Sequence, residues 1–532
     1  MTLKPYLAFL LAATLAASCG QPTRRNAECV GSLETSAKQT TVKTVSGPVA
    51  GYVDDGVFIY KGIPYAKAER FAPAVDPDPW TDVRPSRAFG PTAPAPARSG
   101  WWSDDQAFTM HWDDGFHDED CLRVNVWTGG INDGKKRPVM VWLHGGGFRE
   151  GSGQELICYD GTNLARDHGV VVVSLNHRLN VLGFLDLSAF GAKYVHSGNL
   201  GMMDIVKALE WVKNNISVFG GDPNNVTIFG QSGGGGKVST LMAMPSAKGL
   251  FHKAIIYSGV IVGSNTTATS SKLGEAVVKE LGIAPEEIDR IQTVPYDELN
   301  AAGQRATAGL RGISGGFAPT MDGDVIVSQP FSPAFADFSK DIPVIIGTTL
   351  NEFGTNYYGK DMTLDEAKEI LAPTFGEDAD EFIRAYYEAY PDGSLQDMLS
   401  LDRIFRYNSV ISCRGINAQG AAPVWNYLFA WQKPTDHYSA HGDELPFFFN
   451  TIEAEKRKVP EVTPELEKLQ DIMSDYWVSF AYTGNPNAEG LPIWHSFSEA
   501  NEPCMVFNTP EVVEREAFDS HMQDLIYKHQ RR

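Results

Sequence analysis

Ser232 stands at the centre of a G-x-S-x-G pattern formed by residues 230–234. An apolar run at residues 226–229 precedes it, and an apolar segment at residues 238–244 follows it. A strand that turns sharply into a helix exposes such a serine at the top of a sheet. Glycines flank it because the turn is strained and neighbouring backbone passes close by. The chain contains 51 glycines, so the pattern alone also fits a glycine-rich turn, but the flanking apolar segments favour a nucleophile.

A second glycine-rich segment has the composition of an oxyanion-binding loop. The apolar run at residues 139–143 predicts a buried strand, and residues 144–147 supply one histidine and three glycines. Bare N–H groups of successive glycines can approach a ligand oxygen. We expect Gly146 and Gly147 to donate, together with Gly233, the residue after the nucleophile. A phosphate-binding loop would need a lysine followed by serine or threonine at fixed spacing, which is missing, and a flexible glycine loop remains the alternative.

Further motifs follow one another in a recognisable order, at residues 58–66, 119–127, 180–184, 198–201, 219–223 and 257–259. Together with the two glycine motifs they resemble the type B carboxylesterase family, the α/β-hydrolases that include cholinesterases and bacterial nitrobenzyl esterases. The likeness extends from about residue 42 to residue 507. It implies an α/β-hydrolase fold and a serine hydrolase that acts on carboxylic esters through an acyl-enzyme.

The resemblance also implies the two remaining catalytic residues. It places the acid at Glu352, on the loop after the short apolar run at residues 343–346, and the base at His441. The chain order of serine, acid and histidine is that of α/β-hydrolases. Asp443 and Glu444 are nearby carboxylates that could be mistaken for the acid, but the Glu-Leu-Pro run at residues 444–446 is typical of packing and a helix start.

The chain departs from the family pattern beside the nucleophile. Gln231 occupies a position that is usually glutamate, and Gly233 one that is usually alanine, whereas His144 is within the family's range. No member of the implied triad is lost. These departures bear on substrate preference and pH behaviour rather than on the reaction class.

The candidates for substrate binding are mostly aromatic: Phe148, Gln231 and Phe447, with Tyr357 and Tyr358 as further members of an aromatic pocket. The segment from Trp101 and Trp102 through Trp112 to Phe116 corresponds to the gorge lip of the family. For each of these residues, ordinary core or lid packing is the alternative.

Composition agrees with one large α/β domain. The chain has 532 residues, of which 43% are hydrophobic, and it shows no low-complexity linker or internal repeat. A strand-like run at residues 170–173 and a helix-like segment at residues 205–211 illustrate the alternation that predicts a mostly parallel sheet with helices on both faces. The catalytic loops should lie at the carboxyl ends of the strands. Helical segments at about residues 270–315 and 360–410 are expected to form caps.

The N-terminus is typical of an export signal. Residues 7–17 form an apolar run of about 11 residues, too short to span a bilayer and of the length of a signal core. Lys4 precedes the run, and small residues then lead to Cys19, which resembles a bacterial lipoprotein signal. We therefore expect a signal peptide at residues 1–19, a tether at residues 20–40 and one domain at residues 41–532. The protein would be a periplasmic or cell-surface lipoprotein in a bacterium and otherwise secreted, and a plain signal peptide is the alternative.

The chain gives no sign of a cofactor or a macromolecular partner. A net charge of −21 argues against nucleic acid, and neither a zinc-type motif nor a dinucleotide fingerprint is present, so the expected partner is a small ester. The oligomeric state is left open. Cys121 occupies a position that is often disulfide-bonded in the family, but the usual partner region near residues 89–93 contains no cysteine. Two other functions remain open: an adhesion protein of the superfamily, and an amidase or carbamate hydrolase with the same triad.

Overall fold

The computed structural model describes residues 33–95, 115–261, 263–310, 316–331 and 335–530. The predicted signal peptide with Cys19, most of the tether, and the three tryptophans of the predicted gorge lip lie outside the described residues.

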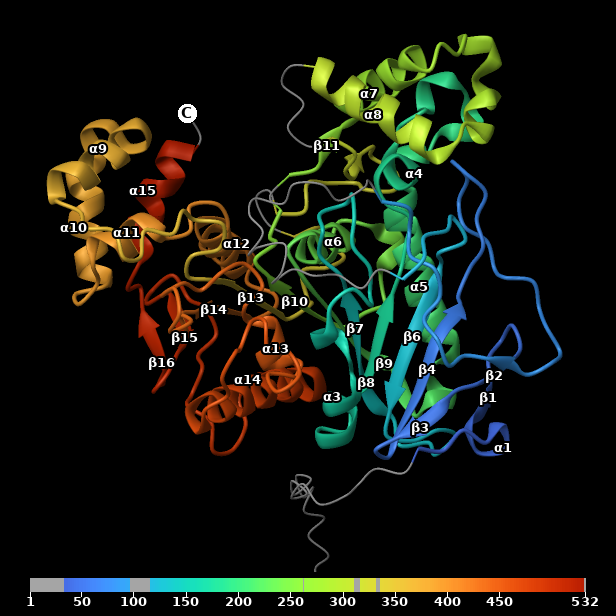
Figure 1. Ribbon diagram of the computed structural model, residues 1–532, viewed down its shortest axis with the longest axis horizontal. Helices are drawn as coiled ribbons and strands as arrows, with labels where there is room; N and C mark the ends of the chain where they lie inside the picture. Colours follow the sequence, from blue (N-terminus) through green and yellow to red (C-terminus); the bar gives the residue numbers. More distant parts are fainter. Residues whose placement is uncertain (1–32, 96–114, 262, 311–315, 332–334, 531–532) are drawn as a thin grey trace, which may run out of the picture.

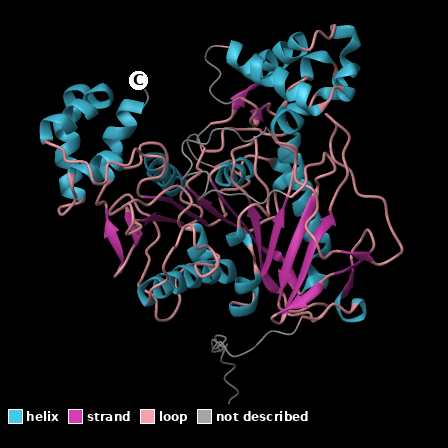
Figure 2. Ribbon diagram, viewed as in Figure 1, coloured by secondary structure: helices cyan, strands magenta, loops and turns pink. Residues whose placement is uncertain are grey.

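An 11-stranded sheet forms the centre of the described part of the chain (Figures 1 and 2). Its order is β16 (Val512–Glu516), β15 (Pro503–Phe507), β14 (Val424–Phe429), β13 (Val344–Thr349), β10 (Lys253–Tyr257), β9 (Gly221–Gln231), β7 (Arg137–Leu143), β8 (Val171–Leu175), β6 (Arg123–Thr128), β4 (Val57–Pro64) and β3 (Tyr52–Asp54). Neighbours from β15 to β8 are parallel, and the pairings at both edges are antiparallel. The predicted mostly parallel sheet is confirmed.

Side chains point alternately to the two faces of the sheet along each strand, so the core has one part on each face. Val139 and Val141 of β7 pack on one side with α5 (Leu200–Asn215), α6 (Gly233–Leu241) and α12 (Arg406–Gln419). Met140 and Trp142 pack on the other with α3 (Thr162–Asp167), α13 (Leu445–Phe448) and α14 (Pro464–Thr483). Because successive strand residues point to opposite faces, a strand covered on both sides must be apolar throughout. This is why the apolar runs of the sequence mark the central strands.

Helices occupy both predicted cap segments. The first segment forms α7 (Thr267–Glu280), the 3₁₀ helix η7 (Pro285–Thr293) and α8 (Tyr296–Gly309), and α4 (Asn180–Phe184), from outside that segment, packs on α8 to complete the first group. The second contains α9 (Leu364–Phe375), α10 (Ala379–Ala389), α11 (Leu395–Ser400) and α15 (Ser520–Gln530). Figure 1 shows the two groups at the upper right and the upper left, beyond the carboxyl ends of the parallel strands. The loops that carry the candidate catalytic residues lie between them.

Two small sheets complete the fold, one near the N-terminus and one beside α7. The strands β1 (Thr41–Lys43), β2 (Pro48–Ala50) and β5 (Arg84–Pro85) form a separate sheet, and β11 (Asn265–Thr266) pairs with β12 (Thr320–Met321). The fold begins before the predicted boundary at residue 41. Glu34 forms a β-bridge with Val53, and the helix α1 (Ala37–Thr40) ends on the buried Thr40.

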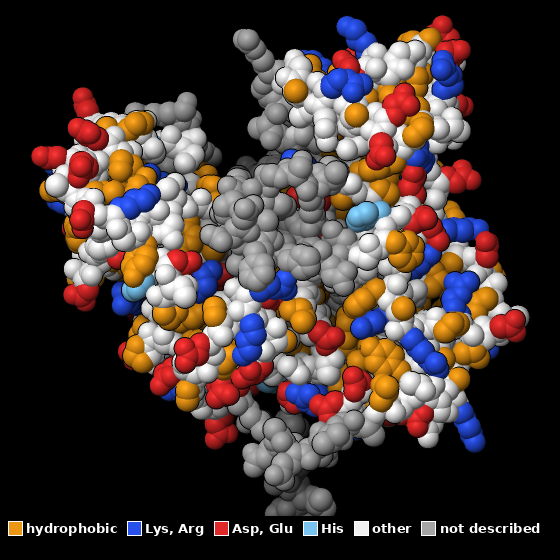
Figure 3. Space-filling model, in the orientation of Figure 1, with side chains coloured by type: hydrophobic (Ala, Val, Ile, Leu, Met, Phe, Trp, Pro, Cys, Tyr) orange, Lys and Arg blue, Asp and Glu red, His pale blue; other side chains and the backbone are white. Residues whose placement is uncertain are grey.

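The visible surface carries charges of both signs, and the described residues contain neither a membrane-spanning helix nor a cluster suited to a metal ion. Figure 3 shows acidic and basic side chains interspersed on the visible face, without a large basic patch there. Within the described ranges, the helices are all too short or too polar to cross a membrane. The same residues contain no cluster of His, Cys, Asp and Glu suited to a metal ion. Cys121, Cys158, Cys413 and Cys504 are buried free thiols.

Candidate active site

Ser232 lies at the sharp turn between β9 and α6. Its φ of 57° and ψ of −124° are far from the usual range of a non-glycine residue. Two backbone hydrogen bonds stabilise this conformation, from Ser232 N to the Tyr257 carbonyl (2.9 Å) and from Gly236 N to the Ser232 carbonyl (3.0 Å). Strain of this kind persists only where the surroundings enforce it, and it is common at functional sites.

The glycines of the G-x-S-x-G pattern are required by close backbone approach. A Cβ atom on Gly230 would lie 2.5 Å from the carbonyl carbon of Gly234. A Cβ atom on Gly234 would lie 1.9 Å from the Leu143 carbonyl oxygen at the end of β7. Neither position has room for any side chain, so the pattern has the steric origin expected from the sequence.

Glu352 and His441 follow the adjacent strands β13 and β14 and are hydrogen-bonded to each other. The Nδ1 atom of His441 donates to Glu352 Oε2 in a very short contact. The two loops are also joined through their backbones, because His441 N donates to the Glu352 carbonyl (3.2 Å). Only 2% of Glu352 and 6% of His441 is exposed, so the pair is shielded from water. The structure thus brings together two of the predicted triad residues, 89 positions apart.

The second oxygen of Glu352 is held by donors that the sequence had not singled out for this role. Ser258 Oγ donates to Glu352 Oε1 at 2.5 Å, and Thr349 N donates to the same oxygen at 2.7 Å. Ser258 follows β10, the strand between β9 and β13, and its hydroxyl also lies 3.5 Å from Glu444 Oε1. Its place directly after the strand next to the nucleophile strand is the signal that could have identified it.

Two further buried acids surround Glu352. Burial and the negative charge of Glu352 raise the pKa of Glu444 well above its ordinary value. The same two causes raise the pKa of Asp402 to about 7, although three backbone N–H groups donate to that carboxyl and oppose the change. Both neighbours therefore hold a proton more readily than an ordinary carboxyl group does.

Gln231 lies against the imidazole on the side opposite Glu352. Its Nε2 atom is 3.0 Å from His441 Nε2. Because His441 Nδ1 donates its proton to Glu352, Nε2 carries the lone pair, and the amide N–H of Gln231 is the donor. Among the described residues, no hydrogen bond joins Ser232 Oγ to His441. Gln231 directly precedes Ser232, so its contact brings the basic nitrogen to the serine turn.

Two phenyl rings lie against the imidazole. The centroid of Phe353 is 4.1 Å from that of His441, and the ring of Phe405 stacks on it at 5.3 Å. Phe353 is 38% exposed. The two phenyl rings thus cover the imidazole, and the part of Phe353 that lies away from it is open to solvent.

The three predicted oxyanion donors are brought together at the start of α6. Gly146 and Gly147 have φ values of 78° and 66°, a region that favours glycine. A Cβ atom on Gly233 would lie 2.2–2.3 Å from backbone atoms of Gly147, so these two backbones are in direct contact. The position of a Cβ atom on Gly147 faces open space. The glycine at residue 233, where the family usually has alanine, permits this close approach.

The predicted substrate-binding residues differ in their surroundings. Phe148 is half-buried and packs edge-to-face on Phe184, with its ring tip facing Gly236 at the start of α6. The prediction that Phe447 lines the pocket is wrong: it is fully buried beneath the sheet and packs on Phe429 and Trp431. Its helix, α13, presents this ring to the core.

The other two aromatic candidates, Tyr357 and Tyr358, lie in the second cap group. Tyr357 packs among the helices α9 to α11, and Tyr358 is exposed and stacks on His437.

Asp443 is a buried carboxylate paired with two lysines. Its Oδ2 atom accepts from Lys433 Nζ (2.8 Å) and from Ala440 N (2.7 Å), and Lys458 Nζ lies 3.4 Å from its other oxygen. The two lysines offset the burial of the carboxylate and keep its pKa below the ordinary value. The ion pairs anchor the loop that carries His441.

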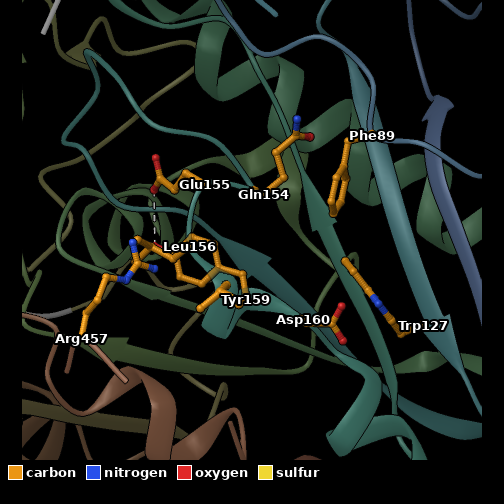
Figure 4. A pocket seen from close by; sticks show the side chains of 10 residues that line it. Phe89, Trp127, Gln154, Glu155, Leu156, Tyr159, Asp160 and Arg457 are labelled. Atoms are coloured by element: carbon orange, nitrogen blue, oxygen red, sulfur yellow. Dashed lines mark hydrogen bonds between the residues drawn. The ribbon is translucent and has the colours of Figure 1, made fainter. Parts of the chain in front are cut away.

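A separate cavity of about 350 Å³ lies on the α3 and α13 side of the sheet (Figure 4). Residues lining it include Phe89, Trp127, Gln154, Tyr159, Asp160 and Arg457. None of Ser232, Glu352 and His441 lines it. It is therefore distinct from the candidate active site.

Comparison with known proteins places the chain in a family. Residues 38–525 match the profile of the Carboxylesterase family. The para-nitrobenzyl esterase of Bacillus subtilis (strain 168) is 36% identical over 500 residues, which are 91% of this chain and 98% of that protein. The phenmedipham hydrolase of Pseudarthrobacter oxydans is 31% identical over 487 residues, covering 87% of this chain and 94% of that protein.

A solved structure agrees with these relatives. An esterase from anaerobic Clostridium hathewayi, described as able to hydrolyse aliphatic aromatic polyesters, superposes with a TM-score of 0.85 at 37% identity. The match covers 94% of this chain and all of that chain. The chain therefore belongs to the carboxylesterase family, whose members are serine hydrolases that act on carboxylic esters. It is an ester hydrolase with the α/β-hydrolase fold, as the sequence predicted.

Proposed function

We propose that the protein hydrolyses small carboxylic esters through an acyl-enzyme on Ser232. The Ser232 hydroxyl attacks the ester carbonyl, and His441 accepts its proton and returns it to the leaving alcohol. Glu352 fixes the tautomer of His441 and stabilises the imidazolium. The N–H groups of Gly146, Gly147 and Gly233 donate to the tetrahedral oxyanion. Water activated by His441 then releases the acid.

The contact between Gln231 and His441 is the observation that carries this proposal. It brings the lone pair of His441 Nε2 to the residue before Ser232, while Nδ1 donates to Glu352. A base must present its lone pair to the nucleophile, so the Gln231 amide has to yield His441 Nε2 to the Ser232 hydroxyl during the reaction, while an acid orients the other nitrogen. Catalytic hydrogen bonds are often long or misaligned in a free enzyme and tighten with substrate, which accommodates a serine that is not bonded to the base.

Turnover of a p-nitrophenyl ester by three variants tests the triad. Ser232→Ala and His441→Ala should each lose activity by roughly 10⁴-fold or more, and the double variant should be no worse, because the residues act as one unit. Additive losses would show that they act in separate steps. A wild-type protein without turnover would favour the adhesion alternative, and turnover of an amide or carbamate analogue would favour the broader hydrolase alternative.

The rings at His441 support a preference for apolar esters. Phe353 and Phe405 lie against the imidazole, and Phe353 is partly exposed. We propose that an aromatic or aliphatic group of the substrate packs on Phe353. Phenyl acetate should then have a higher kcat/KM than methyl acetate, and Phe353→Ala should reduce that ratio. An unchanged ratio in the variant would refute this preference.

Export and lipidation are proposed from the sequence alone. The short apolar run before Cys19 supports a lipoprotein signal, which would tether the enzyme to a bacterial membrane. Cys19→Ala should move the protein from the membrane fraction to the soluble fraction of its host. A wild-type protein found wholly in the soluble exported fraction would leave a plain signal peptide instead.

A further inference from the structure

The oxyanion loop and the nucleophile helix meet through two stretches of glycine. Residues 145–147 and residues 233–236 are all glycine. Gly233 is in contact with Gly147, and a Cβ atom on Gly234 would approach the Leu143 and His144 carbonyls. Glycines permit this approach, but they provide no side chains to fix the orientation of the peptide planes. A catalytic donor needs a fixed orientation before substrate arrives.

Lys237 supplies a side chain at this contact. It is fully buried on α6, one residue after the glycine run. Its Nζ atom donates to the His144 carbonyl at 2.8 Å and to the Gly145 carbonyl at 3.3 Å, and His144 Nδ1 lies 3.0 Å from the same Gly145 oxygen. The ring centroid of Phe148 lies 5.8 Å from the same atom. A lysine followed directly by the apolar segment 238–244 is unusual, and this is the signal in the sequence that could have singled it out.

The chemistry of the peptide unit connects these contacts to the active site. The carbonyl of Gly145 and the N–H of Gly146 belong to one peptide group, which is planar and trans, so the two bonds point in opposite directions. A donor that holds the Gly145 carbonyl therefore directs the Gly146 N–H to the other side of the loop. A hydrogen bond to the carbonyl also polarises the peptide and strengthens its N–H as a donor.

Burial affects the charge of this amine as well. Desolvation lowers the pKa of Lys237 to about 7, and the negative charge of Glu155 opposes the decrease only in part. An amine that is removed from water needs its hydrogen-bond partners, because an unpaired buried polar group is destabilising. The two loop carbonyls are those partners.

We propose that Lys237 is a positioning residue of the oxyanion hole: its ε-amino group fixes the peptide between Gly145 and Gly146 so that the Gly146 N–H points at the substrate oxyanion. This role rests on the proposed function, in which Gly146 is one of three donors. Lys237 acts through the peptide and does not touch the substrate.

Lys237→Met tests the role, with Thr240→Val as the matched control. Methionine keeps an unbranched side chain of similar length but removes the donor. Thr240 is buried on the same helix, and its hydroxyl donates to the Gly236 carbonyl of that helix, at 2.8 Å. The measurements are kcat and KM for a p-nitrophenyl ester, and the Ki of a trifluoromethyl ketone, whose adduct with the serine carries an oxyanion.

Loss of a whole oxyanion donor costs roughly 10²–10³-fold in kcat, so a misaligned donor should cost about 10–100-fold. Lys237→Met should therefore lose about 10–100-fold in kcat with KM nearly unchanged, and its Ki for the ketone should rise by a similar factor. Lys237→Arg, which keeps donors, should recover part of the loss. Thr240→Val should stay within about twofold of wild type in all three constants.

Equal kcat and Ki in Lys237→Met and Thr240→Val would overturn the positioning role. So would a rise in KM alone. If the Met variant does not fold, a structure of the wild-type ketone adduct tests the role instead. Lys237 Nζ should then donate to the Gly145 carbonyl, and Gly146 N should lie within hydrogen-bond distance of the oxyanion. Absence of either contact refutes the positioning role. Persistent turnover by Ser232→Ala would instead refute the proposed function, whatever Lys237 does.

Discussion

Replacement of Gln231 by glutamate should move the acidic limb of the kcat/KM profile to higher pH. The Nε2 atom of Gln231 lies 3.0 Å from Nε2 of His441, and only 3% of Gln231 is exposed. Glutamate has nearly the same size, so the introduced carboxylate would face the imidazole at similar range. A negative charge there favours the protonated ring. Hydrolysis needs the neutral ring as a base, so activity would be lost at a higher pH as acid is added.

The size of the change follows from the distance. Two unit charges about 4 Å apart attract by roughly 4 kcal/mol at an effective dielectric constant of 20, which would correspond to about 3 pH units. The buried carboxylate must also be desolvated, and Glu352 lies on the other side of the same imidazole. Both effects reduce the net attraction. Loss of the amide donor, about 1 kcal/mol for a neutral hydrogen bond, acts in the same direction as the new charge. We expect a displacement of about 1–2 units.

The assay compares kcat/KM profiles on one neutral ester for wild type, Gln231→Glu and Gln231→Met. The methionine variant removes the donor without adding charge, so its limb should move upward by less than about 1 unit. The glutamate variant should also gain activity on a cationic ester relative to the neutral one. An acidic limb that stays in place or moves to lower pH in Gln231→Glu would refute the reasoning.

Three further substitutions test other contacts. Glu352→Gln should lower kcat by roughly 10³–10⁴-fold, because the amide favours the wrong tautomer of His441; a loss under tenfold would argue against this orienting role. Ser258→Ala removes a donor to Glu352 Oε1 and should lower kcat/KM about tenfold. The thermal unfolding midpoint should change by no more than a few degrees. A fully active variant would show that Thr349 N alone is enough to hold Glu352 Oε1. Burial lowers the pKa of Lys237 from 10.5 to about 7, so the folded protein binds fewer protons than the unfolded chain between these values. The free energy of unfolding of the protein should therefore rise with pH, by up to about 1.4 kcal/mol per unit, and Lys237→Met should lack this rise. Denaturant unfolding at pH 7.5 and 9.5 measures the free energy of both proteins. An equal change with pH in wild type and variant would contradict the prediction.

The strands and the serine turn could be predicted from the sequence because their causes are local. A strand that is buried on both faces must be apolar throughout, which marks β7, β9 and β13. The glycines around Ser232 reflect backbone contacts that leave no space for Cβ atoms. Phe447 could not be placed in the same way. A four-residue helix has too little periodicity to show whether an aromatic ring faces a pocket or the core.

The contacts that surround the base depend on long-range packing. Gln231 and His441 are 210 positions apart, and Ser258 lies 94 positions from Glu352. Residues so far apart in the chain leave no pattern in the sequence, because their contacts arise only when β9, β10, β13 and β14 align side by side in the sheet. The resemblance to carboxylesterases identified Gln231, Glu352 and His441, but the role of Ser258 and the orientation of the Gln231 amide required the fold.

Covalent labelling of the nucleophile identifies the residue that attacks the ester. Wild-type protein and Ser232→Ala are treated with a fluorophosphonate, which reacts with an activated serine, and the modified peptide is identified by mass spectrometry. We expect one stoichiometric adduct, on Ser232, that forms in step with the loss of esterase activity and is absent from the variant. An adduct on another residue, or loss of activity without modification of Ser232, would contradict it.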